Sequence, residues 1–223
     1  MSSIHPTSLI ASLDLLAEAY FYQQPISKTQ RQELAALIVS RQSQAGTNAG
    51  YFIPFTAESE RQPNLFSGER LRTAFAKRQI QLIEAARTLK LLGVEDHAVA
   101  QALYAASQRM ESMCYARFCA KGECKHLTVG FMRYLALDGS GDPEPRLDGF
   151  LTQLAGYRDG KGKWGGFPFY YTLLMLSEIR LPQAQAELQY SLPACERYLK
   201  HDWDSDPFSK RQHAILEKVL TRS

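Results

Sequence analysis

The chain has 223 residues, of which 45% are hydrophobic and 22% are charged, so it is long and apolar enough to bury a core of ordinary size. Its 14 glycines and 10 prolines are too few for a collagen-like or low-complexity chain, and its four cysteines are too few for a disulfide scaffold. A formal net charge of +3 is well below the concentrated positive field of a dedicated nucleic-acid-binding protein. We therefore expect a globular protein with no nucleic-acid partner.

The first twenty residues lack the pattern of an export signal. Asp14 and Glu18 interrupt the apolar positions, and no basic leader precedes them. The longest apolar run, 167–176, is well short of the roughly 20 residues that a bilayer crossing needs. We expect a cytoplasmic protein without a membrane span, whose cysteines are free thiols, metal ligands or redox groups rather than permanent cross-links.

Apolar residues recur at helical spacing along most of the chain. The stripe from Leu9 to Tyr20 predicts a first helix, and Ser27 with Gln30 forms a capping-box pair that begins a second one. The same periodicity continues over 67–92, 99–113, 129–135, 147–154, 169–179, 183–200 with a break at Pro193, and 208–221 after the cap Asp206. No stretch alternates as a strand does. We predict an all-α fold of about eight or nine helices, mostly in antiparallel pairs.

Three cysteines and a histidine lie within thirteen residues: Cys114, Cys119, Cys124 and His126. Thiolates and imidazoles are the ligands that tetrahedral zinc prefers, and a glycine lets the chain turn between Cys119 and Cys124. A helix turns about 100° per residue, so Cys114 is expected to face away from Cys119 if both are helical. We therefore select Cys119, Cys124 and His126 as candidate zinc ligands. A fourth position is left for water, a substrate thiol or a distant side chain.

Two other interpretations of these cysteines stay open. Buried cysteines often pack as small hydrophobic side chains, and Cys119 and Cys124, on either side of a turn, could form a redox disulfide. Basic residues around the segment could hold a phosphate, although such residues more often form solvated helix faces. They are Arg109, Arg117, Lys121, Lys125 and Arg133. Residues 67–70 are expected to open the longest helix, where their amides could bind an anion.

A further pattern lies in segment 148–176. It consists of Phe150-Leu151, Gln153, Gly162-Lys163-Trp164, Gly166-Phe167, and Tyr171-Thr172 ahead of an apolar helix. The pattern resembles one repeat of the α/α-toroid superfamily, which contains the terpene cyclases and the protein prenyltransferase β subunits. In that repeat a Gln and a Trp tie the end of one helix to the start of the next. Glu123-Cys124 is similar to the zinc-binding segment of the prenyltransferases, whereas the Asp-x-Asp-Asp motif of the cyclases is absent.

The resemblance implies a partial α/α toroid or a curved array of helix pairs. A full toroid uses about twelve helices, so eight or nine leave the ring open unless a second copy of the chain completes it or loop 46–64 plugs it. The concave face is expected to bind an apolar ligand, such as an isoprenoid, although aromatic rings at such positions often only fill a core. The candidate lining residues are Phe131, Tyr134, Trp164, Phe169, Tyr170 and Tyr171.

We predict a single domain over 1–223, with the N-terminal helices and a packed loop in 1–64 and a toroid-like helical core in 65–223. Two functions of different classes stay open. The first is binding of an apolar small molecule; if the protein is an enzyme, the resemblance implies transferase or lyase chemistry assisted by zinc as a Lewis acid. The second is a non-enzymatic helical scaffold that binds another protein and uses the Cys/His turn as a structural clamp.

Overall fold

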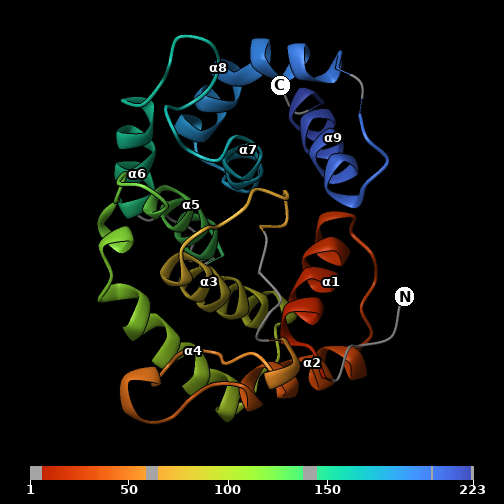
Figure 1. The fold of residues 1–223 in the computed structure, drawn as a ribbon, viewed down its shortest axis with the longest axis vertical. Coiled ribbons are helices and arrows are strands. Elements are labelled where there is room, and N and C mark those ends of the chain that lie inside the picture. Colours follow the sequence, from red (N-terminus) through yellow and green to blue (C-terminus); the bar gives the residue numbers. More distant parts are fainter. Residues whose placement is uncertain (1–6, 59–64, 138–144, 202, 222–223) are drawn as a thin grey trace.

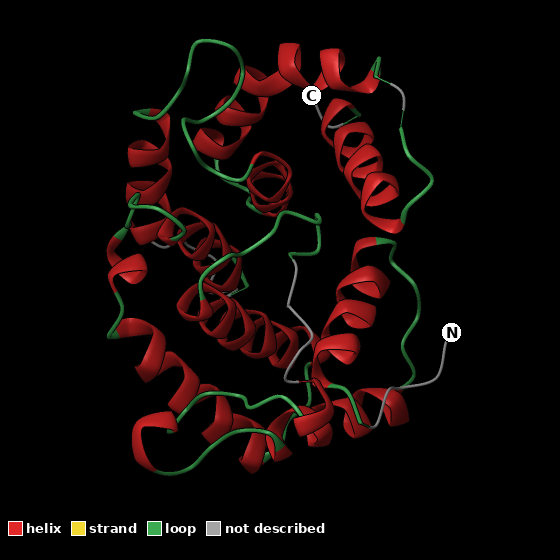
Figure 2. Cartoon of the chain, in the orientation of Figure 1, coloured by secondary structure: helices red, strands yellow, loops and turns green. Residues whose placement is uncertain are grey.

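The computed structural model describes residues 7–58, 65–137, 145–201 and 203–221, and within these ranges the chain forms nine α-helices and no strand (Figures 1 and 2). The helices are α1 (Leu9–Phe21), α2 (Lys28–Ser40), α3 (Ala74–Leu92), α4 (His97–Glu111), α5 (Cys124–Leu135), α6 (Pro145–Ala155), α7 (Phe169–Glu178), α8 (Pro182–Leu199) and α9 (Pro207–Leu220). Three short 3₁₀ helices, η1 (Gly46–Asn48), η2 (Thr56–Glu58) and η3 (Cys114–Arg117), lie between them. The predicted all-α fold of about nine helices is confirmed. Among these helices, none has both the length and the apolar character needed to cross a membrane.

The odd-numbered helices pack against one another in order, with α3, α5 and α7 nearer the centre and α1 and α9 at one edge of the molecule (Figure 1). α3 packs against α1 and α5, and α7 packs against α5 and α9. The even-numbered helices α2, α4, α6 and α8 lie on the outside of this series (Figure 1). Arg211 of α9 joins the first and last helices, because its guanidinium donates to Asp14 at 2.7 and 2.8 Å and to Glu18 at 2.8 Å.

The segment 65–73 crosses the inside of this arrangement as a loop (Figure 1). The expected helix over 67–92 is therefore too long at its start: α3 begins at Ala74, after the cap Thr73. Gly68 has φ +82°, which does not fit a helix, and the Glu69 carboxylate accepts the backbone N–H of Tyr170 at 2.9 Å. Residues 67–70 thus do not form a helix N-terminus. They supply a carboxylate that caps the N-terminus of α7.

Two other helix ends test the sequence patterns. The capping box of Ser27 and Gln30 at α2 and the cap Asp206 at α9 are both present, as predicted. The predicted break at Pro193 is wrong, because α8 continues through it. A proline removes one backbone donor, but the buried Ala194 and Cys195 follow it directly and hold this part of α8 against its neighbours.

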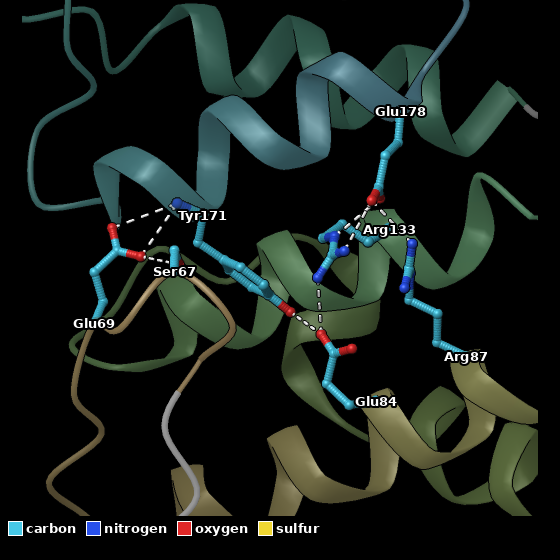
Figure 3. Close-up of polar contacts among 7 residues, drawn as sticks. All are labelled: Ser67, Glu69, Glu84, Arg87, Arg133, Tyr171 and Glu178. Atoms are coloured by element: carbon cyan, nitrogen blue, oxygen red, sulfur yellow. Dashed lines mark hydrogen bonds and ion pairs between the residues drawn. The ribbon is translucent and has the colours of Figure 1, made fainter. Parts of the chain in front are cut away.

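A buried polar cluster links the three central helices α3, α5 and α7 (Figure 3). Arg133 of α5, 3% exposed, donates to Glu178 of α7 at 2.8 and 2.9 Å and to Glu84 of α3 at 3.0 Å. Arg87 of α3 donates to the same Glu178 at 2.9 Å, and the hydroxyl of Tyr171 donates to Glu84. Two arginines therefore face two glutamates. We call these four charged residues the arginine–glutamate cluster.

Candidate metal site

Three cysteines converge where α4 ends and α5 begins. The Sγ atoms of Cys114, Cys119 and Cys124 all lie within 4.8 Å of one another, and those of Cys114 and Cys124 are 3.7 Å apart. Cys114 opens η3, Cys119 lies in the following turn, and Cys124 is the first residue of α5. Cys114 is exposed and the other two are half-buried, so solvent reaches the group. We call these three residues the thiol cluster.

Hydrogen bonds on both sides hold the backbone of the thiol cluster. The N–H of Cys119 donates to the hydroxyl of Thr128 at 3.1 Å, and this hydroxyl donates to the carbonyl of Cys119 at 2.9 Å. The Glu123 carboxylate, next to Cys124, accepts the backbone N–H of Thr73 at 2.8 Å. Phe118 has φ +60°, an uncommon conformation for a bulky residue and one that is often found beside functional groups. The turn is thus fixed to both α5 and the start of α3.

The three thiols have different proton affinities. Burial raises the pKa of the Cys119 thiol, but the backbone N–H of Lys121 and the two neighbouring thiols outweigh it, so the pKa lies below its usual value. Burial and the contact with Cys114 raise the pKa of Cys124 to about 12, and burial also raises the pKa of Cys114. Three thiolates this close repel one another. A divalent cation between them would reverse this balance by favouring the deprotonated form of all three.

The structure brings Cys119 and Cys124 together, and it adds Cys114. The expectation that Cys114 faces away is wrong, because α4 ends at Glu111 and Cys114 begins a separate 3₁₀ helix. The angle of an α-helix therefore does not apply between Cys114 and Cys119. The signal in the sequence was the equal spacing of the three cysteines, each five residues after the last.

His126 does not belong to the group of converging ligand atoms. It follows Cys124 by two residues within α5, which places it about 200° around the helix axis. Its Nδ1 is buried and has no hydrogen-bond partner among the described residues, and burial lowers the pKa of the imidazole. Cys195, on α8, is buried next to Ser191 and is also outside the group. The expected Cys119, Cys124 and His126 set is thus replaced by three cysteines.

The six aromatic residues expected to line a cavity fall into three groups of contacts. Phe131 and Tyr134 of α5 are buried and their ring centroids are 6.0 Å apart. Trp164 is buried and contacts the half-buried Phe169, which contacts Tyr170 in turn. The sixth, Tyr171, is buried and belongs to the contacts of Figure 3. These rings pack on neighbouring side chains, and the apolar ligand stays a prediction.

The two turns on which the resemblance depends are neighbours. Lys125 of α5 donates to the carbonyl of Gly165 at 2.8 Å, which joins the cysteine-bearing turn to the glycine-rich segment. Trp164 donates through its indole N–H to Glu187 of α8 at 2.7 Å. The side chain of Gln153 is exposed and donates to the carbonyl of Gly149 in its own helix. The Gln and Trp link of the toroid repeat is therefore not formed by these two residues.

Comparisons with protein-family models, with curated proteins and with solved structures found no match to this chain. The site is thus defined by its geometry: three thiols from separate elements, a fixed backbone and solvent access on one side.

Proposed function

We propose that the protein is a helical scaffold that binds one zinc ion through the thiol cluster, Cys114, Cys119 and Cys124. The observation that carries this proposal is the convergence of three sulfur atoms within 4.8 Å from η3, the turn and α5. Thiolates are soft ligands and favour zinc over magnesium or calcium, which prefer oxygen. A divalent cation would also offset the burial and the thiol–thiol repulsion that raise the pKa values of Cys114 and Cys124.

The ion would act as a clamp between the end of α4 and the start of α5. Three protein ligands leave the fourth tetrahedral position of zinc for water or for a group from outside the chain. Cys114 is exposed, so this position faces the solvent side of the cluster. We propose that a side chain of a partner protein takes this position, which makes binding of the partner dependent on zinc.

Metal analysis of the reduced protein tests the site directly. We expect the wild type to hold about one equivalent of zinc and to give thiolate-to-cobalt charge-transfer absorption when cobalt replaces it. Cys124→Ser should lose both signals. Cys195→Ala is the matched control, because it removes a cysteine that lies outside the group, and it should keep both.

Two results would contradict the proposal. One is a wild type that stays metal-free after incubation with zinc under reducing conditions. The other is a purified protein in which peptide mapping finds Cys114 and Cys124, whose sulfur atoms are 3.7 Å apart, joined by a disulfide that reductant opens and that forms again on reoxidation even when zinc is present. The second result would instead support the redox interpretation.

A further inference from the structure

A pocket separate from the thiol cluster lies among α1, α3, α5, α7 and α9. Its volume is about 260 Å³, and none of the cysteines lines it. The apolar part of its lining includes Ala17, Phe21, Phe66, Leu91 and Leu174. Pockets that bind drug-sized molecules usually measure roughly 300–1,000 Å³, so this one fits a smaller molecule.

Cationic side chains outnumber anionic ones in the rest of the lining. Arg87, Arg133, Arg180 and Lys218 line the pocket together with a single acid, Glu178. The Glu178 carboxylate already accepts hydrogen bonds from Arg87 and Arg133 (Figure 3), and a second acid, Glu84, contacts Arg133 from α3. The arginine–glutamate cluster is therefore balanced in itself. Arg180, two residues after the end of α7, and Lys218 of α9 raise the number of cations in the lining to four; Lys218 also acts on Glu178 and lies over the ring of Phe21, 4.7 Å from its centroid.

Arg133, which lines the pocket, keeps donor capacity beyond its hydrogen bonds with the two glutamates. A guanidinium has five N–H groups, and the hydrogen bonds of Arg133 with the two glutamates use three of them. An anion beside Arg133 would gain charge-assisted hydrogen bonds, which are about twice as strong as neutral ones. The apolar part of the lining would remain in contact with the uncharged part of the same molecule.

We propose that this pocket binds a small organic oxyanion, with its carboxylate or phosphate group toward Arg133, Arg180 and Lys218 and a short apolar group toward Phe21 and Leu174. The charged end explains the excess of cations, and the apolar end explains why the pocket is not lined by polar groups alone. The proposal does not depend on zinc, because no residue of the thiol cluster lines the pocket.

Titration with four probes tests the ligand class: hexanoate, hexyl phosphate, inorganic phosphate and hexylamine. By calorimetry, we expect hexanoate, hexyl phosphate or both to bind at least about tenfold more tightly than inorganic phosphate and hexylamine. A preference between the first two identifies the head group as a carboxylate or a phosphate ester. Absence of saturable binding for both, or equal binding of hexylamine, would overturn the proposal.

Charge and shape variants locate the binding. Arg180→Gln and Lys218→Gln should each lower the affinity for the tighter-binding probe by about tenfold, because each removes one cationic partner of the anion. Lys210→Gln is the matched control: it removes one exposed charge from the same helix α9 outside the pocket, and should change binding less than about twofold. Ala17→Phe keeps every charge and should abolish binding by filling the pocket. Equal losses in Lys210→Gln and Lys218→Gln, or undiminished binding by a folded Ala17→Phe variant, would show that the probe binds elsewhere.

Discussion

The arginine–glutamate cluster and the thiol cluster are both groups of ionisable side chains held by several helices, but they differ in charge balance. In the first, Arg87 and Arg133 face Glu84 and Glu178, and every residue has a partner of opposite charge. In the second, three groups of the same kind face one another. The charges of the first are paired within the folded chain, although Arg133 keeps donors toward the pocket, whereas the thiolates of the second would be balanced by a bound cation.

This difference separates a structural role from a binding role. Opposite charges buried together hold α3, α5 and α7 in register, and removing one leaves its partners unpaired. Three thiols that the backbone holds together have no partner of opposite charge among themselves, so a bound cation would stabilise the folded chain at this site. We therefore expect variants in the arginine–glutamate cluster to change folding, and variants in the thiol cluster to change metal binding.

The largest effect is expected for Glu178→Ala. This change leaves Arg133 and Arg87, 3% and 5% exposed, without their shared carboxylate, so the free energy of unfolding should fall by roughly 3–5 kcal/mol. Denaturant titration monitored by circular dichroism measures it. Glu217→Ala, which removes an exposed carboxylate from α9, is the control and should cost less than about 1 kcal/mol. Similar losses in both variants would mean that the cluster does not hold the helices together.

Acid should weaken the same cluster. Burial opposes the charge of Glu178, but Arg133 and Arg87 outweigh it and lower its pKa from 4.5 to about 2. A depressed pKa contributes stability that is present above the unfolded value near 4.5 and is lost as the pH falls toward 2. This contribution is roughly 3 kcal/mol. The free energy of unfolding, measured from pH 5 to pH 2.5, should fall less steeply in Glu178→Gln than in the wild type. If it falls equally in both, other carboxylates cause the acid sensitivity.

Zinc affinity should fall in Cys114→Ser, Cys119→Ser and Cys124→Ser. The loss of a ligand should cost more than about 100-fold, above the 10- to 100-fold effect of residues that only orient ligands. The metal-free variants should unfold within about 1 kcal/mol of the metal-free wild type. Competition with a chromophoric chelator measures the affinity. A large loss of stability in the metal-free variants would show that the thiols are packing residues. The thiol cluster would then have a structural role, as the arginine–glutamate cluster does.

Proton release gives the smallest but most specific signal. The pKa values of Cys114 and Cys124 are raised, so both carry protons at pH 7 and must lose them when zinc binds. Calorimetry of zinc binding in buffers of different ionisation enthalpy should therefore report at least about two protons released per ion. Release of fewer than one would indicate oxygen or nitrogen ligands in place of these thiols.

Local signals in the sequence predict where most helices lie, but they do not predict contacts between residues that are far apart in the chain. The cap of α2 depends on Ser27 and Gln30, three residues apart, and could be read directly. The loop over 65–73 could not, because Glu69 is held there by the N-terminus of α7, about a hundred residues later. Helical periodicity continued through this loop, so the start of α3 was placed too early.

The two clusters were predicted to different extents for the same reason. Cys119 and Cys124 flank a turn, so their spacing predicts that they pair. The apolar stripe over 99–113 predicts a helix that continues beyond Glu111, where α4 ends, and this turns Cys114 away from the pair. Arg133 was grouped with basic residues near the cysteines. Its partners Glu84 and Glu178 lie 49 and 45 residues away, and no local pattern connects them.

The contact between Arg211 and Asp14 also has a consequence for synthesis of the chain. The two residues are separated by 197 positions, so the bond that joins α9 to α1 cannot form until almost the whole of this sequence has left the ribosome. Translation proceeds at roughly 5–20 residues per second, which leaves α1 without this neighbour for at least about ten seconds. During that interval the apolar face of Leu9, Leu13 and Leu16 depends on α2 and α3 for cover.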